Sequence, residues 1–459
     1  MSIERDRYKN LGLALLNLSA WIRAQPWLRA IYRHFPEAIR VRVSQMLATR
    51  ANKRVRFSRT PAWTRHLPVI VPLPPDPSGA YGAGLGVNVF AYARGQFGLA
   101  EAARLYARAL LSVGCPVAVH DITLDLAHSV GDDSLDAHIG SDTPHSVNLI
   151  FVNPDYLDDA IASVGRDRLA GRRNIGCWFW ELEKFPDDWL PALSEVDEIL
   201  VSSAFVADIV RRVTEKPVLH VPLPVIEQLD SGLQRADFGL GERDFVFLCS
   251  FDYNSFLARK NPLAVIKAFR RAFEHQCTDV RLLIKCSNGH RYPERLRELL
   301  NAAAVDQRIT VRDEVIDRAH VQALQRCVDA YVSLHRSEGF GLGLAECMRL
   351  GKPVIATAWS GNMDFMNDDN SCLVDYRLVP VGEGEYPHHV GQRWAEPDVE
   401  CAARHMRRLV IEPAFAKRIG AHAALDISQR FSAHSTAMQF VSRLRMLSQY
   451  DPACQGDSH

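Results

Sequence analysis

The sequence predicts an α/β protein with two doubly wound, mainly parallel sheets, and three observations support this fold class. Short apolar stretches of strand length alternate with segments of helical periodicity from about residue 84 onward. The same alternation begins again near residue 244, after the polar, glycine-containing segment 224–243. The chain has 459 residues and is 47% apolar, which is enough for two or three domains with sizeable cores.

The first half contains the elements expected of one such domain, residues 84–226. The apolar, β-branched run LGVNVFAYA (85–93) predicts its first strand. A glycine-containing turn follows within RGQFGLAEAARLYARALLSVG (94–114), where apolar residues then recur at three- and four-residue steps, as in an amphipathic helix. Further buried strands are expected at 116–122, 148–153, 173–180, 198–203 and 218–225.

The second half repeats this pattern and predicts a second domain, residues 244–430. A helix is expected at 261–275, with Pro262 in its first turn, where proline is well tolerated. The last segment, residues 431–450, predicts a helix that crosses back to the first domain. Strands are expected at 244–251, 280–287, 308–314, 329–335 and 353–358. Two open sheets of this kind imply a cleft where the carboxyl ends of their strands face each other.

The N-terminal segment, residues 1–66, is expected to be a basic, mainly helical extension. Residues 1–65 hold 14 Lys and Arg against 3 Asp and Glu, although the formal net charge of the chain is zero. Apolar residues at helical spacing beside arginines are typical of a helix that lies on an anionic membrane. The alternative is an ordinary helical extension that packs on the main body. No aromatic and basic motif supports nucleic-acid binding.

The ten cysteines predict neither a disulfide framework nor a zinc site. None forms a C-x-x-C pair, and their spacings match no zinc pattern. We therefore expect reduced thiols in a cytoplasmic protein. No apolar run reaches about 18 residues, so no spanning helix is expected. If residues 1–66 bind membrane, the protein lies at the inner face of the cytoplasmic membrane.

The stretch HRSEGFGLGLAECMRLGKPVIATAWSG (335–361) predicts a ligand site. Glu338 and Glu346 bracket a glycine-rich turn that follows an expected strand and leads into a helix near Leu342. Glycines let the backbone approach a ligand closely, and the start of a helix offers free N–H groups to an anion. Carboxylates suit vicinal hydroxyls because they offer several acceptor lone pairs. This arrangement favours an anionic, sugar-bearing ligand.

Three cations follow neighbouring strands of the second half. Arg259 and Lys260 lie in ARKNP (258–262), and Lys285 lies in the apolar strand LLIKCSNG. Cations at adjacent strand ends can neutralise a diphosphate. The alternative for each is a solvated surface cation, which is less suited to Lys285 because its neighbours are apolar.

At these residues the sequence resembles the retaining glycosyltransferases of family 4, which have the GT-B fold of two Rossmann-like domains. The resemblance covers about residues 84–450. The E-x7-E element EGFGLGLAE and the following GKPVIAT are its most specific parts, and RKNPLAVIKAF and GLAEAARLYARALLSVGCPVAVHD are looser parts. It implies transfer of a sugar from a nucleotide-activated donor with retention of anomeric configuration, without a metal or another cofactor.

The resemblance also implies roles for individual residues. Glu338, Lys285 and Lys260 are the implied catalytic residues, with Glu338 at the donor sugar and the two lysines at the diphosphate. Glu346 is expected to bind the nucleotide ribose, and the base to rest near Val311 to Val315. Further donor-binding residues are expected to be Arg259, Gly339, Phe340, Gly341, Leu342 and, in the first-domain loop, Gly98.

Two departures from the family pattern stand out. Many members have an arginine a few residues before the RK pair, whereas this chain has FDYNSFLA, with Asp252 and Asn254. Many also carry a His-Glu-Pro-type element in the first domain, whereas this chain has CWFWELEKFPDDW. Trp180 and Glu181 of that segment are expected on the acceptor side; the alternative is an aromatic cluster beneath the cleft. The pattern resembles a bacterial polysaccharide-type subgroup.

The expected function is therefore a hexosyltransferase of bacterial exopolysaccharide or lipopolysaccharide synthesis. Its partners are a nucleotide-sugar donor and a glycan or lipid-linked acceptor. One alternative is a nucleotide-sugar epimerase of similar fold, which needs a second acid/base group that the sequence does not reveal. Another is a non-catalytic scaffold that binds sugar nucleotides. Product formation from a donor separates transferase from scaffold, and acceptor dependence separates transferase from epimerase.

Overall fold

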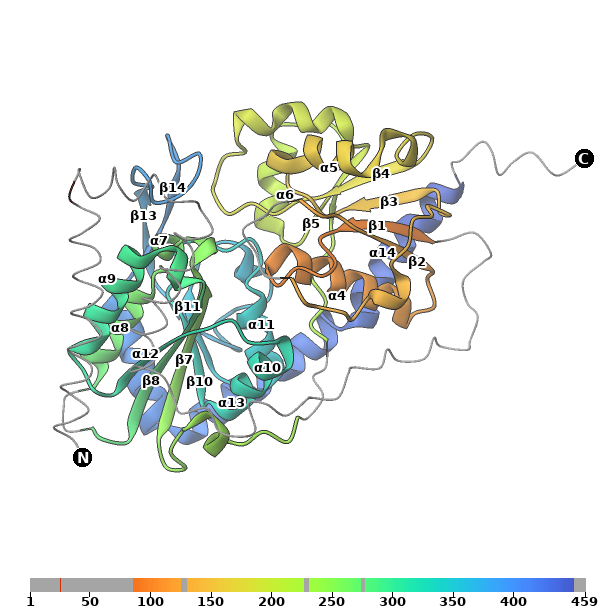
Figure 1. The fold of residues 1–459 in the computed structure, drawn as a ribbon. Helices are drawn as coiled ribbons and strands as arrows, with labels where there is room; N and C mark the ends of the chain where they lie inside the picture. Colours follow the sequence, from red (N-terminus) through yellow and green to blue (C-terminus); the bar gives the residue numbers. More distant parts are fainter. Residues whose placement is uncertain (1–24, 26–85, 125–129, 227–230, 274–276, 450–459) are drawn as a thin grey trace, which may run out of the picture.

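The computed structural model describes residues 25, 86–124, 130–226, 231–273 and 277–449, and element labels follow Figure 1. Two Rossmann-like α/β domains lie next to each other, the first in orange to yellow-green and the second in green to blue (Figure 1). The predicted fold class is thereby confirmed. The basic extension predicted for residues 1–66 lies outside the described residues, except for Gln25.

The first domain is built on a six-stranded parallel sheet with the order β2-β1-β3-β4-β5-β6. Its elements are β1 (Val87–Ala91), α4 (Gly98–Ser112), β2 (Val117–Asp121), β3 (Val147–Ile150), α5 (Leu157–Val164), β4 (Arg173–Cys177), β5 (Glu198–Val201), α6 (Ala204–Arg211) and β6 (Val218–His220). The strand order reverses between β1 and β3. The turn from β1 to Gly98 therefore lies at a topological switch point, where ligands bind in open α/β sheets.

The second domain repeats this design with the order β12-β11-β10-β7-β8-β9. Its strands are β7 (Phe245–Asp252), β8 (Val280–Ser287), β9 (Ile309–Asp313), β10 (Ala330–Ser333), β11 (Val354–Thr357) and β12 (Cys372–Val374). Its helices are α7 (Leu257–Lys260), α8 (Pro262–Ala272), α9 (Pro293–Ala304), α10 (Arg318–Cys327), α11 (Leu342–Arg349), α12 (Val399–Ile411) and α13 (Pro413–Arg430). The strand order reverses between β7 and β10, so the segments that follow these two strands meet at one switch point.

The second domain also carries an antiparallel hairpin that the sequence analysis did not anticipate. It consists of β13 (Tyr376–Pro380) and β14 (Arg393–Pro397). Its connecting loop reaches the first domain, where the side-chain amide of Gln392 both accepts from the backbone N–H of Lys184 and donates to the carbonyl of Lys184. The hairpin loop therefore links the two domains.

The last helix, α14 (Ala433–Gln449), packs against α4 of the first domain. Thr436 donates to the carbonyl of Pro222, and the partly exposed Arg443 pairs with buried Glu198, 2.6 Å between nitrogen and oxygen. One apolar core cluster includes both Phe151 of the first domain and Phe340 of the second. The two domains thus share a continuous apolar contact. In the described part of the chain, no helix is long and apolar enough to cross a membrane.

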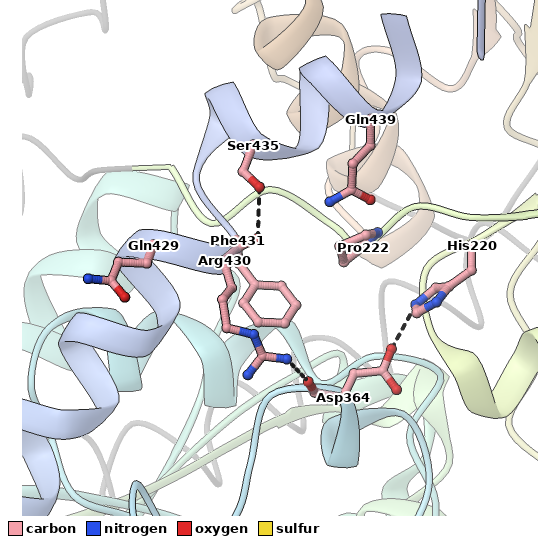
Figure 2. Close-up of a pocket in the computed structure, with 8 residues that line it drawn as sticks. All are labelled: His220, Pro222, Asp364, Gln429, Arg430, Phe431, Ser435 and Gln439. Atoms are coloured by element: carbon pink, nitrogen blue, oxygen red, sulfur yellow. Dashed lines mark hydrogen bonds and ion pairs between the residues drawn. The ribbon is translucent and has the colours of Figure 1, made fainter. Parts of the chain in front are cut away.

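A cavity of about 580 Å³ lies where the chain passes between the domains (Figure 2). Its floor includes an interdomain pair in which His220 Nε2 lies 2.8 Å from an Asp364 carboxylate oxygen. The same carboxylate accepts from the backbone N–H of Ala204, at the start of α6, at 2.9 Å. The lining residues are His220, Pro222, Asp364, Gln429, Arg430, Phe431, Ser435 and Gln439.

Candidate active site

The turn that carries Glu338 is held in place by close backbone contacts. The backbone N–H of Glu338 donates to Ser360 Oγ at 2.8 Å, and the carbonyl of Glu338 accepts from the N–H of Gly361 at 2.9 Å. A Cβ at Gly361 would lie 2.2 Å from the carbonyl oxygen of Gly339, so only glycine fits there. Gly341 has φ of +97° immediately before α11, a conformation that favours glycine. The backbone thus fixes where Glu338 points.

The carboxylate of Glu338 lies between two cations from the segment that follows β7. Lys260 Nζ is 2.5 Å from one oxygen, and Arg259 Nη1 is 3.2 Å from the other. Burial raises the pKa of Glu338, but Lys260 and Arg259 lower it more strongly, and the net pKa is about 2. Glu338 is therefore ionised at neutral pH. The switch point between β7 and β10 is what brings these three residues together.

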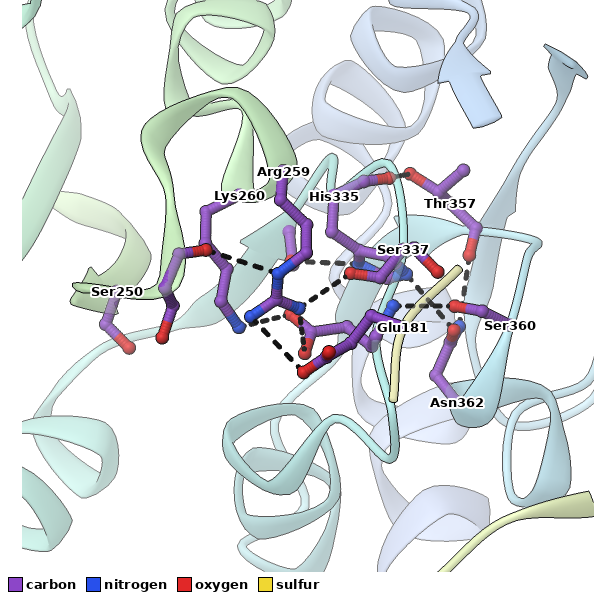
Figure 3. Close-up of polar contacts among 12 residues, drawn as sticks. Glu181, Ser250, Arg259, Lys260, His335, Ser337, Thr357, Ser360 and Asn362 are labelled. Carbon is purple, nitrogen blue, oxygen red and sulfur yellow. Dashed lines mark hydrogen bonds and ion pairs between the residues drawn. The ribbon is translucent and has the colours of Figure 1, made fainter. Parts of the chain in front are cut away.

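Arg259 is a buried residue that supports Glu338, and its guanidinium makes most of its contacts with protein groups. It donates to the carbonyls of Ser255 and Ser337 as well as to Glu338, and it lies 3.8 Å from Glu181 of the first domain (Figure 3). Its side chain is only 5% exposed. Burial lowers the pKa of Arg259, but Glu181 and Glu338 raise it above its ordinary value. The predicted diphosphate contact of Arg259 stays a prediction.

Lys285 is nine-tenths buried near the carboxyl end of β8. Because side chains alternate along a strand, Lys285 shares a face with Leu283, which belongs to the core cluster that contains Leu344 of α11. Burial lowers the pKa of Lys285. Within the residues that the structure describes, no hydrogen bond or ion pair involves its ammonium group. A lysine that is largely buried and pairs with none of the described residues is suited to an anionic ligand.

Glu346 lies in α11 with both carboxylate oxygens in contact with protein groups. Gln325 of α10 donates to one oxygen at 3.1 Å, and Arg318 pairs with the other. Arg318 also pairs with Glu101 of the first domain. Nothing in the sequence singled out Arg318, because its two partners lie 28 and 217 residues away. The predicted ribose contact of Glu346 stays a prediction.

The remaining predicted donor-binding residues are a buried aromatic residue and residues that can offer only backbone groups or little side-chain bulk. Phe340 is buried and its ring packs on Phe365, so only its backbone can serve a ligand. Leu342 begins α11, where the first N–H groups have no helical acceptor. Gly98 begins α4, and a Cβ built there meets no atom within 4 Å. Gly339 lies against the first domain, because its carbonyl accepts from Ser203 Oγ at 2.5 Å.

The W-x-W-E segment lies at the contact between the domains. Trp180 is 3% exposed and packs edge-on against Trp189, with Tyr386 and His388 of the hairpin loop nearby. Trp180 is thus part of a buried aromatic cluster. Glu181, in contrast, turns toward Arg259 and accepts from the hydroxyl of Tyr386 at 2.7 Å. Whether either residue contacts an acceptor stays a prediction.

The stretch FDYNSFLA, which lacks the expected arginine, is connected to the end of β8 by hydrogen bonds of Asp252. Asp252 accepts from the backbone N–H of Asn254 and from the side chains of Ser287 and Asn288. It therefore ties the end of β7 to the end of β8. In the described residues, no group of three or more His, Cys, Asp or Glu side chains could hold a metal ion.

Part of the chain matches a known protein family, and several solved structures are similar to it. Residues 242–394, most of the second domain, match the family model described as glycosyl transferases group 1. No curated protein sequence matches the chain. The pneumococcal O-GlcNAc transferase GtfA, solved with UDP and GlcNAc, is 14% identical with a TM-score of 0.47 over 66% of this chain. The chain spans 57% of the length of that protein.

Two further solved structures cover the chain more fully. Sucrose-phosphate synthase from Thermosynechococcus elongatus is 15% identical, with a TM-score of 0.56 over 80% of this chain and 100% of that chain. Anabaena HepE, solved with UDP and glucose, is 14% identical, with a TM-score of 0.57 over 79% of this chain and 100% of that chain. At such identities the likeness shows the fold alone. The chain therefore has the GT-B fold, and its second domain matches the group 1 glycosyl transferases.

Proposed function

We propose that the protein is a retaining glycosyltransferase that moves a sugar, of hexose type, from a nucleotide-sugar donor to a glycan or lipid-linked acceptor. Its role in this proposal is the synthesis of bacterial exopolysaccharide or lipopolysaccharide. One observation carries the proposal: ionised Glu338 and its partner Lys260 meet at the switch point between β10 and β7. Lys285, which pairs with none of the described residues, lies near the carboxyl end of β8, the strand next to β7. The family match of residues 242–394 supports the proposal. We take the first domain as the acceptor domain; it contacts Gly339 through Ser203 and Arg259 through Glu181.

The proposed chemistry follows from where the charges lie. The bond between the sugar C1 and the diphosphate oxygen breaks, so positive charge develops on the sugar and negative charge on the diphosphate. Lys285 and Lys260 stabilise the diphosphate, while the Glu338 carboxylate lies beside the sugar. The acceptor oxygen forms the new bond to C1 on the same face, and its proton passes to the leaving diphosphate. No separate base residue is needed in this scheme.

Glu338 acts as a positioning and charge-stabilising group in this proposal. Its two oxygens already accept from Lys260 and Arg259, so it is held rigidly and stays ionised. A fixed carboxylate next to a developing oxocarbenium ion needs no reorganisation at the moment of reaction. In this proposal, closure of the two domains over the bound donor excludes water, which limits wasteful hydrolysis of the donor.

The deciding experiment screens the purified protein against a panel of nucleotide sugars by thermal shift and by donor hydrolysis. We expect one donor to raise the melting temperature and to be hydrolysed slowly without an acceptor. Glu338→Gln should remove turnover, whereas Glu383→Gln, at an exposed glutamate of the hairpin loop, should not. Binding without any turnover, unchanged by Glu338→Gln, would favour a scaffold. Conversion of the donor sugar without transfer would favour an epimerase.

A further inference from the structure

Arg318, the first residue of α10, lies between two carboxylates that belong to different domains. It pairs with Glu346 of α11, and its Nε lies 3.0 Å from Glu101 of α4 in the first domain. The side chains of Glu101 and Glu346 are 14% and 5% exposed, whereas that of Arg318 is 28% exposed. These charges are therefore only partly screened by solvent, and Arg318 connects the domains electrostatically.

The bridge continues into the loop that precedes α4. Arg104 lies 2.7 Å from the second oxygen of Glu101 and donates to the carbonyls of Ala93 and Gly95 at 2.9 and 2.7 Å. The turn after β1 is thus part of the same network as Arg318. Burial raises the pKa of Glu101, but Arg318 and Arg104 lower it more, so Glu101 remains a charged partner.

Glu346 is held from two sides by donors of different character. Gln325 is 1% exposed and contacts Glu346 from within the core. Arg318 is partly exposed and contacts Glu346 from the interdomain side, since its other partner belongs to α4. A ligand that approaches Glu346 from the cleft therefore meets Arg318 first. A ribose can donate two hydroxyls to a carboxylate, and these compete with the guanidinium for the same oxygen.

We propose that Arg318 occupies the Glu346 carboxylate in the unliganded protein, and that the ribose hydroxyls of the donor displace it onto Glu101. This inference rests on the proposed function, because it takes Glu346 as the ribose-binding group. Arg318 is thus a positioning residue that couples nucleotide binding to the contact between the domains. Donor binding breaks the link from α4 to α11, and the link in turn lowers the apparent donor affinity.

The test titrates UDP, GDP and ADP into the wild-type protein and variants by calorimetry at pH 7.5. For the nucleotide that the wild type binds, we expect Arg318→Ala to bind about tenfold more tightly, because the competitor for Glu346 is gone. Glu101→Gln should bind no more tightly than the wild type, because Arg318 loses its alternative partner and stays on Glu346. Arg270→Ala, which removes an exposed arginine of α8, should leave affinity unchanged.

Unchanged or weaker nucleotide binding by Arg318→Ala overturns the inference while the proposed function stands, since the wild type binds. No nucleotide binding by the wild type overturns the proposed function and this inference with it. A second readout guards against a poorly folded variant: amide hydrogen exchange of residues 98–112 in the wild type. Exchange there should rise when nucleotide binds, because the bridge to α4 is released. Exchange that stays constant or falls overturns the inference.

Discussion

The carboxylate of Glu181 in the first domain lies 3.8 Å from the guanidinium of Arg259 in the second. Arg259 in turn contacts Glu338, so only one residue separates the first domain from Glu338. The orientation of Glu338 therefore depends on the position of the first domain relative to the second. The hydroxyl of Tyr386, in the hairpin loop, donates to Glu181, so the contact between Glu181 and Arg259 also depends on the position of this loop.

Glu181→Gln should lower kcat about tenfold or more with little change in melting temperature. The neutral amide keeps the shape of the side chain but removes the charge that helps to orient Arg259. Steady-state kinetics with the identified donor and acceptor measures the effect. Glu183→Gln is the matched control, because Glu183 pairs with Arg393 at the surface, where ion pairs contribute little. Equal kinetics for the two variants would contradict the role assigned to Glu181.

Glu338 should make the stability of the protein depend on acid pH. Its pKa of about 2 in the folded protein lies below the ordinary glutamate pKa of 4.5, which applies to the unfolded chain. Its ionised form therefore stabilises the folded state above about pH 4.5, by about 3 kcal/mol, and this contribution is lost as the pH falls toward 2. Denaturant unfolding of wild type and Glu338→Gln between pH 7 and 3 tests this. The difference in unfolding free energy should stay constant down to about pH 5 and then shrink; a constant difference throughout would be evidence against it.

Lys285→Ala should weaken the binding of the nucleoside diphosphate much more than it changes the stability of the fold. Because no hydrogen bond or ion pair joins its ammonium group to any of the described residues, its removal breaks no such contact and should leave the melting temperature nearly unchanged. Loss of its contact to the diphosphate should weaken binding about tenfold or more, since charge-assisted hydrogen bonds are strong. Calorimetry provides the measurement, with Lys267→Ala at an exposed position of α8 as control. A destabilised Lys285→Ala variant with normal affinity would show that Lys285 is structural.

Gln392→Ala should loosen the hairpin contact between the domains. The substitution removes both hydrogen bonds to the backbone of Lys184, each of which contributes about 1 kcal/mol. Hydrogen exchange of residues 180–189 should increase while exchange in β7 and β8 does not change. Gln429→Ala, at an exposed glutamine beside the cavity, serves as control. If exchange in 180–189 stays the same, the hairpin does not hold this segment.

The fold was predictable from sequence because its signals are local. Apolar runs of strand length and the three- and four-residue helical steps indicated both sheets, and an apolar strand around Lys285 indicated that it is buried. The hairpin was missed, because β13 is mostly exposed and neither strand has a clear apolar alternation. The bridge of Arg318 could not be predicted, because it depends on how two domains meet. The contact of Ser203 with Gly339 could not be predicted for the same reason, although a serine at the start of α6 is a local sequence signal.

Gly361→Ala tests whether the packing under the Glu338 turn matters for catalysis. The new Cβ would lie 2.2 Å from the carbonyl oxygen of Gly339 and 2.8 Å from the nitrogen of Phe340. Both are backbone atoms, so no rotamer change relieves the clash and the turn itself must shift. Overpacking of this kind costs about 1–3 kcal/mol of stability. The shift of the turn should also break the hydrogen bond from Ser203 and misalign Glu338. We therefore expect kcat to fall by about a hundredfold. Gly140→Ala is the control, since a Cβ there meets nothing within 4 Å. Denaturant unfolding and steady-state kinetics together decide the matter, because a stability loss with normal kcat would mean that the turn tolerates displacement.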